Sequence, residues 1–306
     1  MERGRIEQLI ELPLDELIFM ANKARREGIG AFIETCGIIN AKSGACGEDC
    51  RFCAQSSHYS SSIKKYPLKD IDTIVSSARK AKSNGSKKFG IVTSGNSLSD
   101  EELEIVCGAV SVISKDVGIS PCASLGALSY GAFRKLKESG LQRYHHNIET
   151  SGNFYPNIVS THVYGERVAT IISAKKAGLE VCSGGILGMG ESWSDRIDMA
   201  FLLKELDVES VPLNFLVPIK GTPMENTPPI SPHDAIRTIA IFRILLPDKT
   251  IKVVAGRESV LKDHQEDIFA AGANGMLVGG YLTIQGRSVA EDVALLKDIE
   301  RTWNNG

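Results

Sequence analysis

Residues 88–125, KFGIVTSGNSLSDEELEIVCGAVSVISKDVGISPCASL, predict one complete strand–helix–strand unit. Lys88–Thr93 and Gly118–Leu125 are short β-rich runs, and Asp100–Lys115 between them has the apolar spacing of an amphipathic helix. Two strands joined through a helix pair in parallel within one sheet. This stretch therefore indicates an α/β fold with a parallel sheet.

The same alternation of strand and helix continues from about residue 32 to the end of the chain. The expected strands, eight in all, are Phe32–Asn40, Lys88–Thr93, Gly118–Leu125, Arg143–Ile148, Glu180–Leu187, Ser210–Val217, Thr250–Ala255 and Asn274–Val278. The expected helices include Asp70–Ser83, Asp100–Lys115, Glu166–Lys176, Ser192–Leu206 and Pro232–Leu246. Eight such units with no break in composition favour a closed (β/α)8 barrel of the TIM type over an open doubly wound sheet.

The whole chain, residues 1–306, is expected to form a single barrel domain. With 306 residues and 42% hydrophobic content it can bury a large core, and barrels of this class reach this size as one domain. Residues 1–31 precede the first strand as a helical extension, in which Pro13 opens the helix Pro13–Arg26.

Charge and hydropathy narrow the class of partner. The formal net charge is −2, and acidic and basic residues are mixed along the chain, so no basic face suggests nucleic acid or an anionic membrane. Residues 1–12 lack the apolar core of a signal peptide, and no later run reaches the roughly 20 apolar residues that span a bilayer. We therefore expect a cytoplasmic protein that acts on a small molecule.

The seven cysteines, an odd number, indicate metal or redox chemistry in a protein of this class. Three of them form the run Cys46-Gly-Glu-Asp-Cys50-Arg-Phe-Cys53, in the loop after the first strand. A zinc site would need a fourth ligand, for which His58 is the local candidate, whereas a [4Fe–4S] cluster can leave one iron open. Free exposed thiols would oxidise, so we favour the cluster. Cys107, on an apolar helix face, is expected to pack in the core.

The strands are also expected to present polar side chains to the barrel interior. With a period of two, one face of each strand carries polar groups while the other carries apolar groups that must meet the helices. The polar faces comprise Ser120, Cys122 and Ser124; His145, Asn147 and Glu149; and Asn214. Buried polar groups need partners, so this lining predicts a polar ligand or cofactor inside the barrel.

The cysteine run, with its aromatic residue before the last cysteine, resembles the radical S-adenosylmethionine (SAM) superfamily. The resemblance implies that Cys46, Cys50 and Cys53 bind three irons of a [4Fe–4S] cluster, that SAM chelates the fourth iron, and that Phe52 lies near the adenine. It further implies that the reduced cluster cleaves SAM to a 5′-deoxyadenosyl radical, which attacks unactivated C–H bonds.

A glycine-rich element, Gly184-Gly-Ile186-Leu-Gly188-Met-Gly-Glu191, is similar to the G-x-I-x-G-x-x-E element of the same superfamily. By this resemblance the adenine packs closely on Gly184, Ile186 and Gly188. Without the cysteine run, a tight turn into the helix Ser192–Leu206 explains these glycines equally well.

Longer strings narrow the resemblance to the biotin synthase family over nearly the whole chain. They are Ser43-Gly-Ala-Cys46, Ala54-Gln-Ser-Ser57, Tyr144-His-His-Asn-Ile-Glu-Thr-Ser151, Val181-Cys-Ser-Gly-Gly185, Val211-Pro-Leu-Asn214, Lys220-Gly-Thr-Pro223 and Ala255-Gly-Arg-Glu258. Such strings are more specific than the cysteine run, which many unrelated reactions share. The activity implied is sulfur insertion into dethiobiotin, with two SAM molecules consumed for each biotin formed.

The family resemblance also implies roles for the residues of the lumen. Asn147 and Glu149 would hold the SAM ribose, Arg167 the SAM carboxylate, and Asn214 with His145 and Asn147 the ureido ring of dethiobiotin. The family string usually reads Asn-His-Asn-Leu-Asp, so His145 and Glu149 depart from it, although both keep hydrogen-bonding capacity. A core histidine at His145 and a solvated helix residue at Arg167 are the structural alternatives.

The second, sulfur-donating cluster is where the chain departs most from the family. There the ligands are cysteines on strands two, three and five and an arginine; Cys122, Cys182 and Arg257 match, but the strand-two position is Gly90. Alternate strands of a barrel contribute side chains to one layer, so we expect Cys36 on strand one to replace the missing ligand. The auxiliary cluster could then be [2Fe–2S] or a four-iron type with an extra sulfide. The alternative is that Cys36 is a small core residue.

Two other functions are alternatives to biotin synthesis. One is a different radical SAM barrel enzyme, similar to a hydrogenase maturase or a carbon-skeleton mutase, and the other is a non-catalytic iron–sulfur carrier. Asn214 and the Ala-Gly-Arg-Glu string favour biotin synthesis, and the polar lining argues against a carrier. The resemblance also implies an electron donor such as flavodoxin or ferredoxin and admits a homodimer.

Overall fold

The computed structural model describes residues 3–282 and 286–305. The strands are β1 (Glu34–Lys42), β2 (Lys88–Thr93), β3 (Ser120–Ser124), β4 (Arg143–His145), β5 (Glu180–Cys182), β6 (Gly185–Leu187), β7 (Ser210–Phe215), β8 (Thr250–Val253) and β9 (Gly275–Leu277). The helices are α1 (Arg3–Gln8), α2 (Leu14–Gly28), α3 (Ile71–Ser83), α4 (Asp100–Val112), α5 (Tyr130–Glu138), α6 (Tyr164–Lys176), α7 (Trp193–Glu205), α8 (Pro232–Leu245), α9 (Arg257–Leu261), α10 (Asp267–Ala270) and α11 (Val289–Asn305), with short turns η1 (Leu9–Glu11), η2 (Ile113–Val117) and η3 (Tyr155–Asn157).

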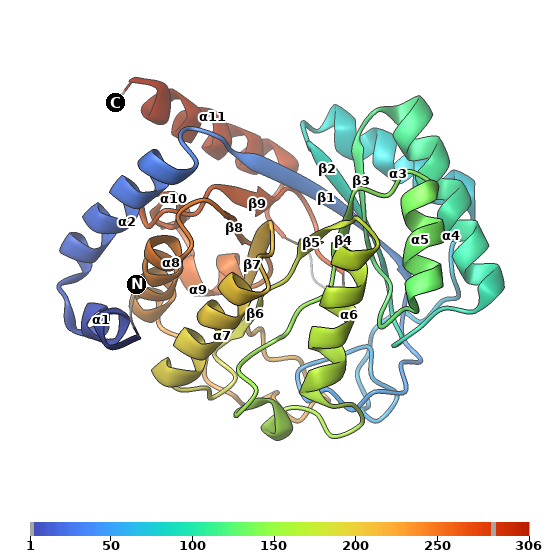
Figure 1. Ribbon diagram of the computed structural model, residues 1–306, viewed down its shortest axis with the longest axis horizontal. Helices are drawn as coiled ribbons and strands as arrows, with labels where there is room; N and C mark the ends of the chain where they lie inside the picture. Colours follow the sequence, from blue (N-terminus) through green and yellow to red (C-terminus); the bar gives the residue numbers. More distant parts are fainter. Residues whose placement is uncertain (1–2, 283–285, 306) are drawn as a thin grey trace.

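The strands form one closed parallel barrel ringed by helices (Figure 1). Their order in the sheet is β5-β4-β3-β2-β1-β9-β8-β7-β6, and pairing of β5 with β7 closes the ring. The predicted (β/α)8 barrel of the TIM type is confirmed. The expected leading helix is also present as α2, which packs on α8, and Arg25 of α2 lies 3.7 Å from the centre of the Trp303 ring in α11.

One predicted strand is interrupted. Glu180–Leu187 was expected to be continuous, whereas β5 and β6 are two short segments on the same side of β7, pairing through Cys182 with Ser210 and through Gly185 with Leu213. The backbone of β7 approaches so closely here that a Cβ at Gly184 would lie 1.9 Å from the Pro212 carbonyl oxygen. Two segments thus make one side of an eight-sided barrel.

Capping explains why several helices begin where the sequence predicts. Asp70 accepts a hydrogen bond from the Thr73 amide at the start of α3, and Ser99 forms a capping box with Glu102 at the start of α4. The predicted helix Asp100–Lys115 continues past α4 as the π-helical turn η2, which ends at Gly118 with φ of 67°. Among the described residues no helix is both long and apolar enough to cross a bilayer.

Candidate active site

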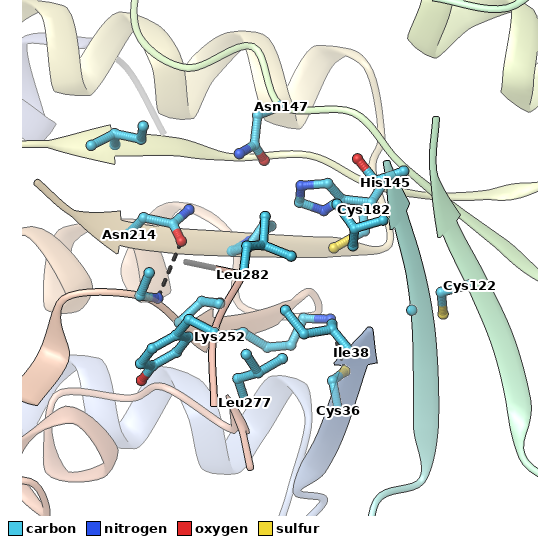
Figure 2. A pocket seen from close by; sticks show the side chains of 18 of the residues that line it. Cys36, Ile38, Cys122, His145, Asn147, Cys182, Asn214, Lys252, Leu277 and Leu282 are labelled. Atoms are coloured by element: carbon cyan, nitrogen blue, oxygen red, sulfur yellow. Dashed lines mark hydrogen bonds between the residues drawn. The ribbon is translucent and has the colours of Figure 1, made fainter. Parts of the chain in front are cut away.

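A cavity of about 390 Å³ lies inside the barrel. Its polar lining includes Cys36, Cys122, Cys182, His145, Asn147, Glu149, Asn214 and Lys252. Figure 2 shows Asn147 and Asn214 toward one end and Cys36 and Cys122 toward the other, with His145 beside Cys182. The residues of the predicted polar faces therefore do line the cavity, except Ser120, whose hydroxyl donates to Gln142 Oε1 (2.6 Å). Apolar side chains such as Ile38 and Leu277 complete the wall.

The loop that carries the cysteine run is folded back on itself and held against the segment 157–162. The Cys46 amide donates to the Gln55 carbonyl (3.1 Å), and the Ser57 amide donates to the Cys46 carbonyl (2.7 Å). The Asp49 carboxylate accepts from the Ser160 amide (2.8 Å), and hydrogen bonds from Ser160 and Thr161 hold the pKa of Asp49 low despite its partial burial. The backbone thus fixes the loop without using its three thiols.

The donor set of this loop fits an iron–sulfur cluster. Cys46, Cys50 and Cys53 are free and half-buried, and burial raises the pKa of Cys50 and raises that of Cys53 to about 11. A bound cation would offset this effect and keep the thiolates charged. His58, the local zinc-ligand candidate, instead places its Nε2 2.9 Å from the Gly47 carbonyl oxygen.

A single metal ion has a different requirement from a cluster. In residues 3–282 and 286–305, no group of three or more His, Cys, Asp or Glu side chains stands close enough to hold one ion. A four-iron cluster is much wider than one ion, so its thiolate ligands stand further apart. The loop is therefore compatible with a cluster.

Glu149 occupies a strained position next to this loop. Its φ of 68° lies in the left-handed region, which a non-glycine residue adopts at an energetic cost that functional sites often carry. The Arg167 guanidinium donates to Glu149 Oε1 (2.9 Å) and to the Asn147 carbonyl (2.7 Å), and Asn147 Nδ2 donates to Glu149 Oε2 (3.3 Å). The structure thus joins Asn147, Glu149 and Arg167 in one polar cluster, and Arg167 is mostly buried rather than solvated.

The glycine-rich element has a clear local structure. The Glu191 carboxylate accepts from the amides of Gly188 (2.9 Å) and Met189 (2.8 Å) and from Arg196 Nε (2.8 Å). Gly188 has φ of 91°, a conformation that favours glycine. Of the three residues expected near the adenine, Ile186 lines the cavity, whereas Gly184 and Gly188 shape the backbone that presents it.

Asn214 of β7 is held by two backbone groups. Its Nδ2 donates to the Gly185 carbonyl (3.2 Å), and its Oδ1 accepts from the Ala255 amide (3.2 Å), a contact drawn in Figure 2. The amide retains one N–H and one oxygen lone pair for a ligand. Its orientation in the cavity is therefore fixed before anything binds.

Cys36, Cys122 and Cys182 lie on β1, β3 and β5 and line the same cavity. Burial raises the pKa of Cys122 to about 12, with Cys36 contributing in the same direction. Burial also acts on Cys182, but Lys252, a hydrogen bond from His145 and the charge of Arg143 together lower the pKa of Cys182 to about 6. The three thiols thus share one electrostatic environment.

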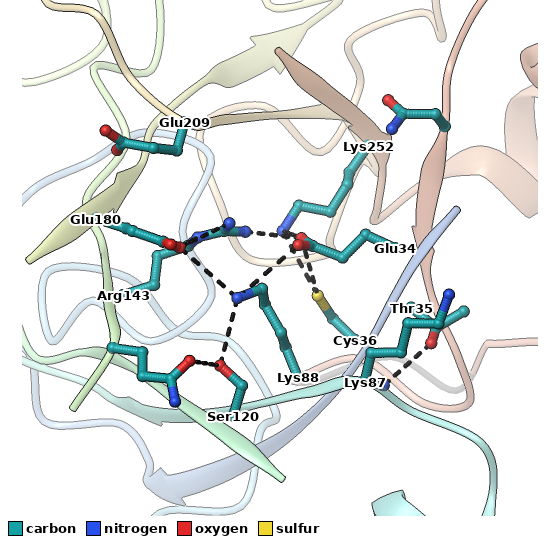
Figure 3. A network of polar contacts seen from close by, with 12 residues as sticks. Glu34, Thr35, Cys36, Lys87, Lys88, Ser120, Arg143, Glu180, Glu209 and Lys252 are labelled. Atoms are coloured by element: carbon teal, nitrogen blue, oxygen red, sulfur yellow. Dashed lines mark hydrogen bonds and ion pairs between the residues drawn. The ribbon is translucent and has the colours of Figure 1, made fainter. Parts of the chain in front are cut away.

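A charged network forms the floor beneath these thiols (Figure 3). The Glu34 carboxylate accepts from Arg143 Nη1 (2.7 Å) and Lys252 Nζ (3.0 Å), and Lys88 lies 3.9 Å away. Lys252 Nζ is also 3.5 Å from Cys36 Sγ. Arg143, Lys252 and Glu34 are buried, and the Lys88 side chain is 14% exposed. The second carboxylate, Glu180, pairs with Arg143 (2.8 Å) and Lys88 (3.6 Å), and its side chain is 46% exposed. This floor favours an anionic occupant.

The comparisons with known proteins identify the family. Residues 40–203 match the radical SAM superfamily, and residues 212–301 match the biotin and thiamin synthesis associated domain. The chain is 46% identical over 297 residues to the biotin synthase of Acetivibrio thermocellus, covering 97% of this chain and 91% of that protein. It is 50% identical over 292 residues to the biotin synthase of Endomicrobium trichonymphae, covering 95% and 91%.

The chain belongs to the biotin synthase family. Among solved structures, it resembles methylornithine synthase with a TM-score of 0.83 at 19% identity, covering 97% of this chain and 92% of that one. It also resembles the FeFe-hydrogenase maturase from Carboxydothermus hydrogenoformans with a TM-score of 0.80 at 19% identity, covering 96% and 77%. These two likenesses show the barrel fold alone, whereas the full-length identities distinguish the biotin synthase family from other radical SAM barrels.

For a member of this family, one predicted site residue is misplaced. Arg257 was expected beside Cys36, Cys122 and Cys182, but its side chain is fully buried in α9, where it pairs with Asp292 (2.7 Å) and Gln265 (2.7 Å). It is not among the residues that line the cavity. Position 257 directly follows the turn at Gly256, φ 83°, which carries the chain away from the barrel interior.

Three basic residues do line the cavity, Lys88 on β2, Arg143 on β4 and Lys252 on β8, and Lys252 Nζ lies 3.5 Å from Cys36 Sγ. Sequence reasoning gave no role to these three residues or to Glu34. The sequence did contain a sign of this network, because three strands begin with a charged residue. Glu34, Lys88 and Arg143 are the first residues of β1, β2 and β4. Burying such charges is costly unless they are paired, so several of them at one end of a barrel indicate a network.

Proposed function

We propose that this chain is a biotin synthase that converts dethiobiotin to biotin by radical SAM sulfur insertion. The observation that carries the proposal is the cavity in a chain of this family, where three free thiols and a cationic floor lie at one end and fixed amides lie at the other. The whole of residues 1–306 then acts as one barrel domain, with residues 1–31 as a helical extension.

Cys46, Cys50 and Cys53 would hold the [4Fe–4S] cluster to which SAM binds. When bound, the reduced cluster supplies the electron that cleaves SAM to methionine and the 5′-deoxyadenosyl radical, which removes hydrogen from dethiobiotin. Phe52 lines the cavity beside the loop and would flank the adenine. The three thiols are half-buried, which limits their contact with bulk water.

Asn147, Glu149 and Arg167 would bind SAM. Glu149 Oε1 is already paired with Arg167, and its position at φ 68° directs the carboxylate into the cavity, where it can accept from the ribose hydroxyls. Arg167 keeps donors for the SAM carboxylate. Gly184, Ile186 and Gly188 would form the surface on which the adenine packs.

Asn214, with His145 and Asn147, would bind the ureido ring of dethiobiotin. The two backbone hydrogen bonds of Asn214 leave one donor and one acceptor on adjacent atoms, which complements the adjacent N–H and C=O groups of a urea. His145 lies beside Cys182 in the cavity (Figure 2), and its proximity helps to lower the pKa of the Cys182 thiol.

Cys36, Cys122 and Cys182 would hold the auxiliary cluster that donates sulfur, either [2Fe–2S] or a four-iron type with an extra sulfide. Gly90 pairs with Cys122 on the neighbouring strand and has no side chain to offer a ligand. Lys252, rather than Arg257, supplies the cation next to these thiols, and its charge stabilises the thiolates.

The test is anaerobic reconstitution with iron and sulfide, followed by incubation with SAM, a reductant such as flavodoxin or ferredoxin, and dethiobiotin. We expect biotin, with two 5′-deoxyadenosines per biotin, and SAM cleavage that rises on addition of dethiobiotin. A different radical SAM activity would leave cleavage insensitive to dethiobiotin. A non-catalytic carrier would transfer its cluster to apoproteins and form no 5′-deoxyadenosine.

The auxiliary site is tested separately by iron and sulfide counting with Mössbauer spectra on wild type and Cys36→Ala. We expect the variant to keep the SAM-binding cluster, lose the auxiliary iron and make no biotin. Cys107→Ala is the matched control, because Cys107 is a buried thiol of α4 outside the cavity. A Cys36→Ala variant with both clusters and full activity would exclude Cys36 as a ligand.

The free, unpaired state of all seven thiols agrees with a cytoplasmic location.

A further inference from the structure

His162 lies against the cysteine loop and contacts one of its thiols. His162 Nε2 is 3.6 Å from Cys50 Sγ, and the imidazole side chain is only 6% exposed. His162 ends the segment that the loop holds in place, since the Arg51 amide donates to the Ile158 carbonyl (2.9 Å) and Asp49 binds the Ser160 amide. Backbone hydrogen bonds between the cysteine loop and the segment 158–162 thus hold the His162 ring against the Cys50 sulfur.

The opposite ring nitrogen is held by a tyrosine. Tyr155 Oη is 2.7 Å from His162 Nδ1, and Tyr155 itself is 2% exposed in a small apolar cluster that includes Ile158 and Met189. When the Tyr155 hydroxyl donates a hydrogen bond to Nδ1, the neutral imidazole carries its proton on Nε2. The ring then donates toward Cys50 Sγ.

The groups around Nε2 favour the same assignment. Besides the Cys50 sulfur, the Glu48 carboxylate lies 3.8 Å from Nε2. A bare nitrogen lone pair facing a thiolate and a carboxylate would be repelled by both, whereas an N–H is attracted by both. A doubly protonated ring would also donate from Nε2, so a donor faces Cys50 in either case.

Cys50 differs from Cys53 in where its sulfur finds donors. The backbone amides of Gln55 and Ser56 act to lower the pKa of the Cys53 thiol, so donors of the loop itself lie near that sulfur. Near the Cys50 sulfur lies a side-chain nitrogen, His162 Nε2 at 3.6 Å, which comes from a segment more than 100 positions later in the chain. Removing it would leave a buried thiolate with weaker solvation.

We propose that Tyr155 and His162 form a positioning pair for the SAM-binding cluster, in which Tyr155 orients the imidazole and His162 donates a hydrogen bond to the Cys50 thiolate. The inference rests on the proposed function, because it requires that Cys50 binds iron. Hydrogen bonds to cluster sulfurs draw electron density from the thiolate and raise the reduction potential. The pair therefore makes the cluster easier to reduce.

The test uses the reconstituted full-length protein and compares His162→Leu, His162→Gln and Tyr155→Phe. The readout is the midpoint potential of the SAM-binding cluster, from a redox titration followed by EPR of the reduced state. We expect His162→Leu to lower the potential and to slow SAM cleavage at limiting reductant by roughly tenfold or more. The Gln side chain retains an N–H and should restore part of the potential, and Tyr155→Phe should give an intermediate value.

His58→Gln is the matched control, since this second histidine near the cysteine run bonds the Gly47 carbonyl instead of a thiol, and we expect an unchanged potential. ENDOR on the reduced wild type, with histidine labelled with 15N, adds a measurement that depends on no variant. We expect a proton that couples to the cluster and exchanges in D2O, together with a coupling from a labelled histidine nitrogen. Absence of that proton, or an unchanged potential in a fully loaded His162→Leu, overturns the inference. If the wild type forms no cluster, the proposed function fails instead.

Discussion

At the scale of single residues, the surroundings of each cysteine distinguish candidate cluster ligands from a cysteine that only packs in the core. Six of the seven thiols lie in the cysteine run or on the cavity wall, whereas Cys107, a residue of α4, packs in the core. A thiol that packs among apolar side chains is a small hydrophobe, and a thiol next to Lys252 or in a polar loop is a potential ligand.

Replacing any one of Cys46, Cys50 and Cys53 by Ala should abolish SAM cleavage, because three thiolates are the fewest that hold a four-iron cluster while one iron stays open to SAM. The measurement is 5′-deoxyadenosine formed under reducing conditions, and Cys107→Ala should retain it. Continued formation by any of the three variants would contradict the assignment.

Asn214→Ala should weaken binding of dethiobiotin much more than binding of SAM. A lost hydrogen bond that leaves a buried partner unpaired costs about 1–3 kcal/mol, or roughly 5- to 150-fold in Kd. Equilibrium binding of each ligand in the absence of reductant measures this, with thermal unfolding to check that the backbone contacts of Asn214 are not essential to the fold. Equal losses for both ligands would show that Asn214 does not recognise the ureido ring.

The residues that sequence reasoning found and those that it missed differ in kind. Cys122, His145 and Asn214 were predicted to face inward because a strand has a strict period of two, and Cys36 because alternate strands contribute to one layer. Lys252 and His162 were missed, because a basic residue in a strand and a histidine in a loop carry no local sign of what they will meet. Arg257 was misplaced because the strand ends before it and the turn at Gly256 redirects the chain.

At the scale of elements, the close approach of two backbones requires a glycine at Gly184, and the sequence shows the glycine without showing the contact that requires it. Gly184 was expected at the adenine, and the structure adds a second reason for it, the contact between the β5–β6 junction and β7. The short length of both strands follows from this junction. The pattern of β-branched residues alone predicts one continuous strand, since periodicity does not record contacts between backbones.

Gly184→Ala should destabilise the protein by about 1–3 kcal/mol or more, because its Cβ would lie 1.9 Å from the Pro212 oxygen. Gly165→Ala is the matched control: this glycine lies in the first turn of α6 with open space around the added Cβ, so the change should be neutral or stabilising by up to about 1 kcal/mol. Urea unfolding of both variants provides the comparison. Similar stabilities would refute the close approach.

The pair Arg257–Asp292 should act as a structural tie between α9 and α11. Both side chains are fully buried, so Asp292→Ala should cost about 3–5 kcal/mol of folding free energy. The double variant Arg257→Met with Asp292→Leu removes both charges and should recover a large part of that loss. Its auxiliary iron content should equal that of wild type, and a loss of auxiliary iron in a folded double variant would return Arg257 to the ligand set.

At the scale of the whole molecule, one closed barrel brings distant segments to two ends of a single cavity. The cysteine loop after β1, Glu149 after β4 and Asn214 in β7 surround one end, and the thiols with their charged floor lie at the other. This order could be predicted because parallel strands place their ends together. The excess of positive charge beneath the thiols could not be predicted from the sequence, because it depends on which charged side chains are buried together.

The most direct test of this arrangement is a single-turnover reaction after reconstitution with heavy-isotope sulfide, in which all free sulfide is removed before SAM, reductant and dethiobiotin are added. The sulfur inserted should come from the cluster held by Cys36, Cys122 and Cys182, so the biotin formed should carry the heavy isotope, and Cys122→Ala should form 5′-deoxyadenosine without biotin. Unlabelled biotin from the wild type, or labelled biotin from Cys122→Ala, would contradict the account.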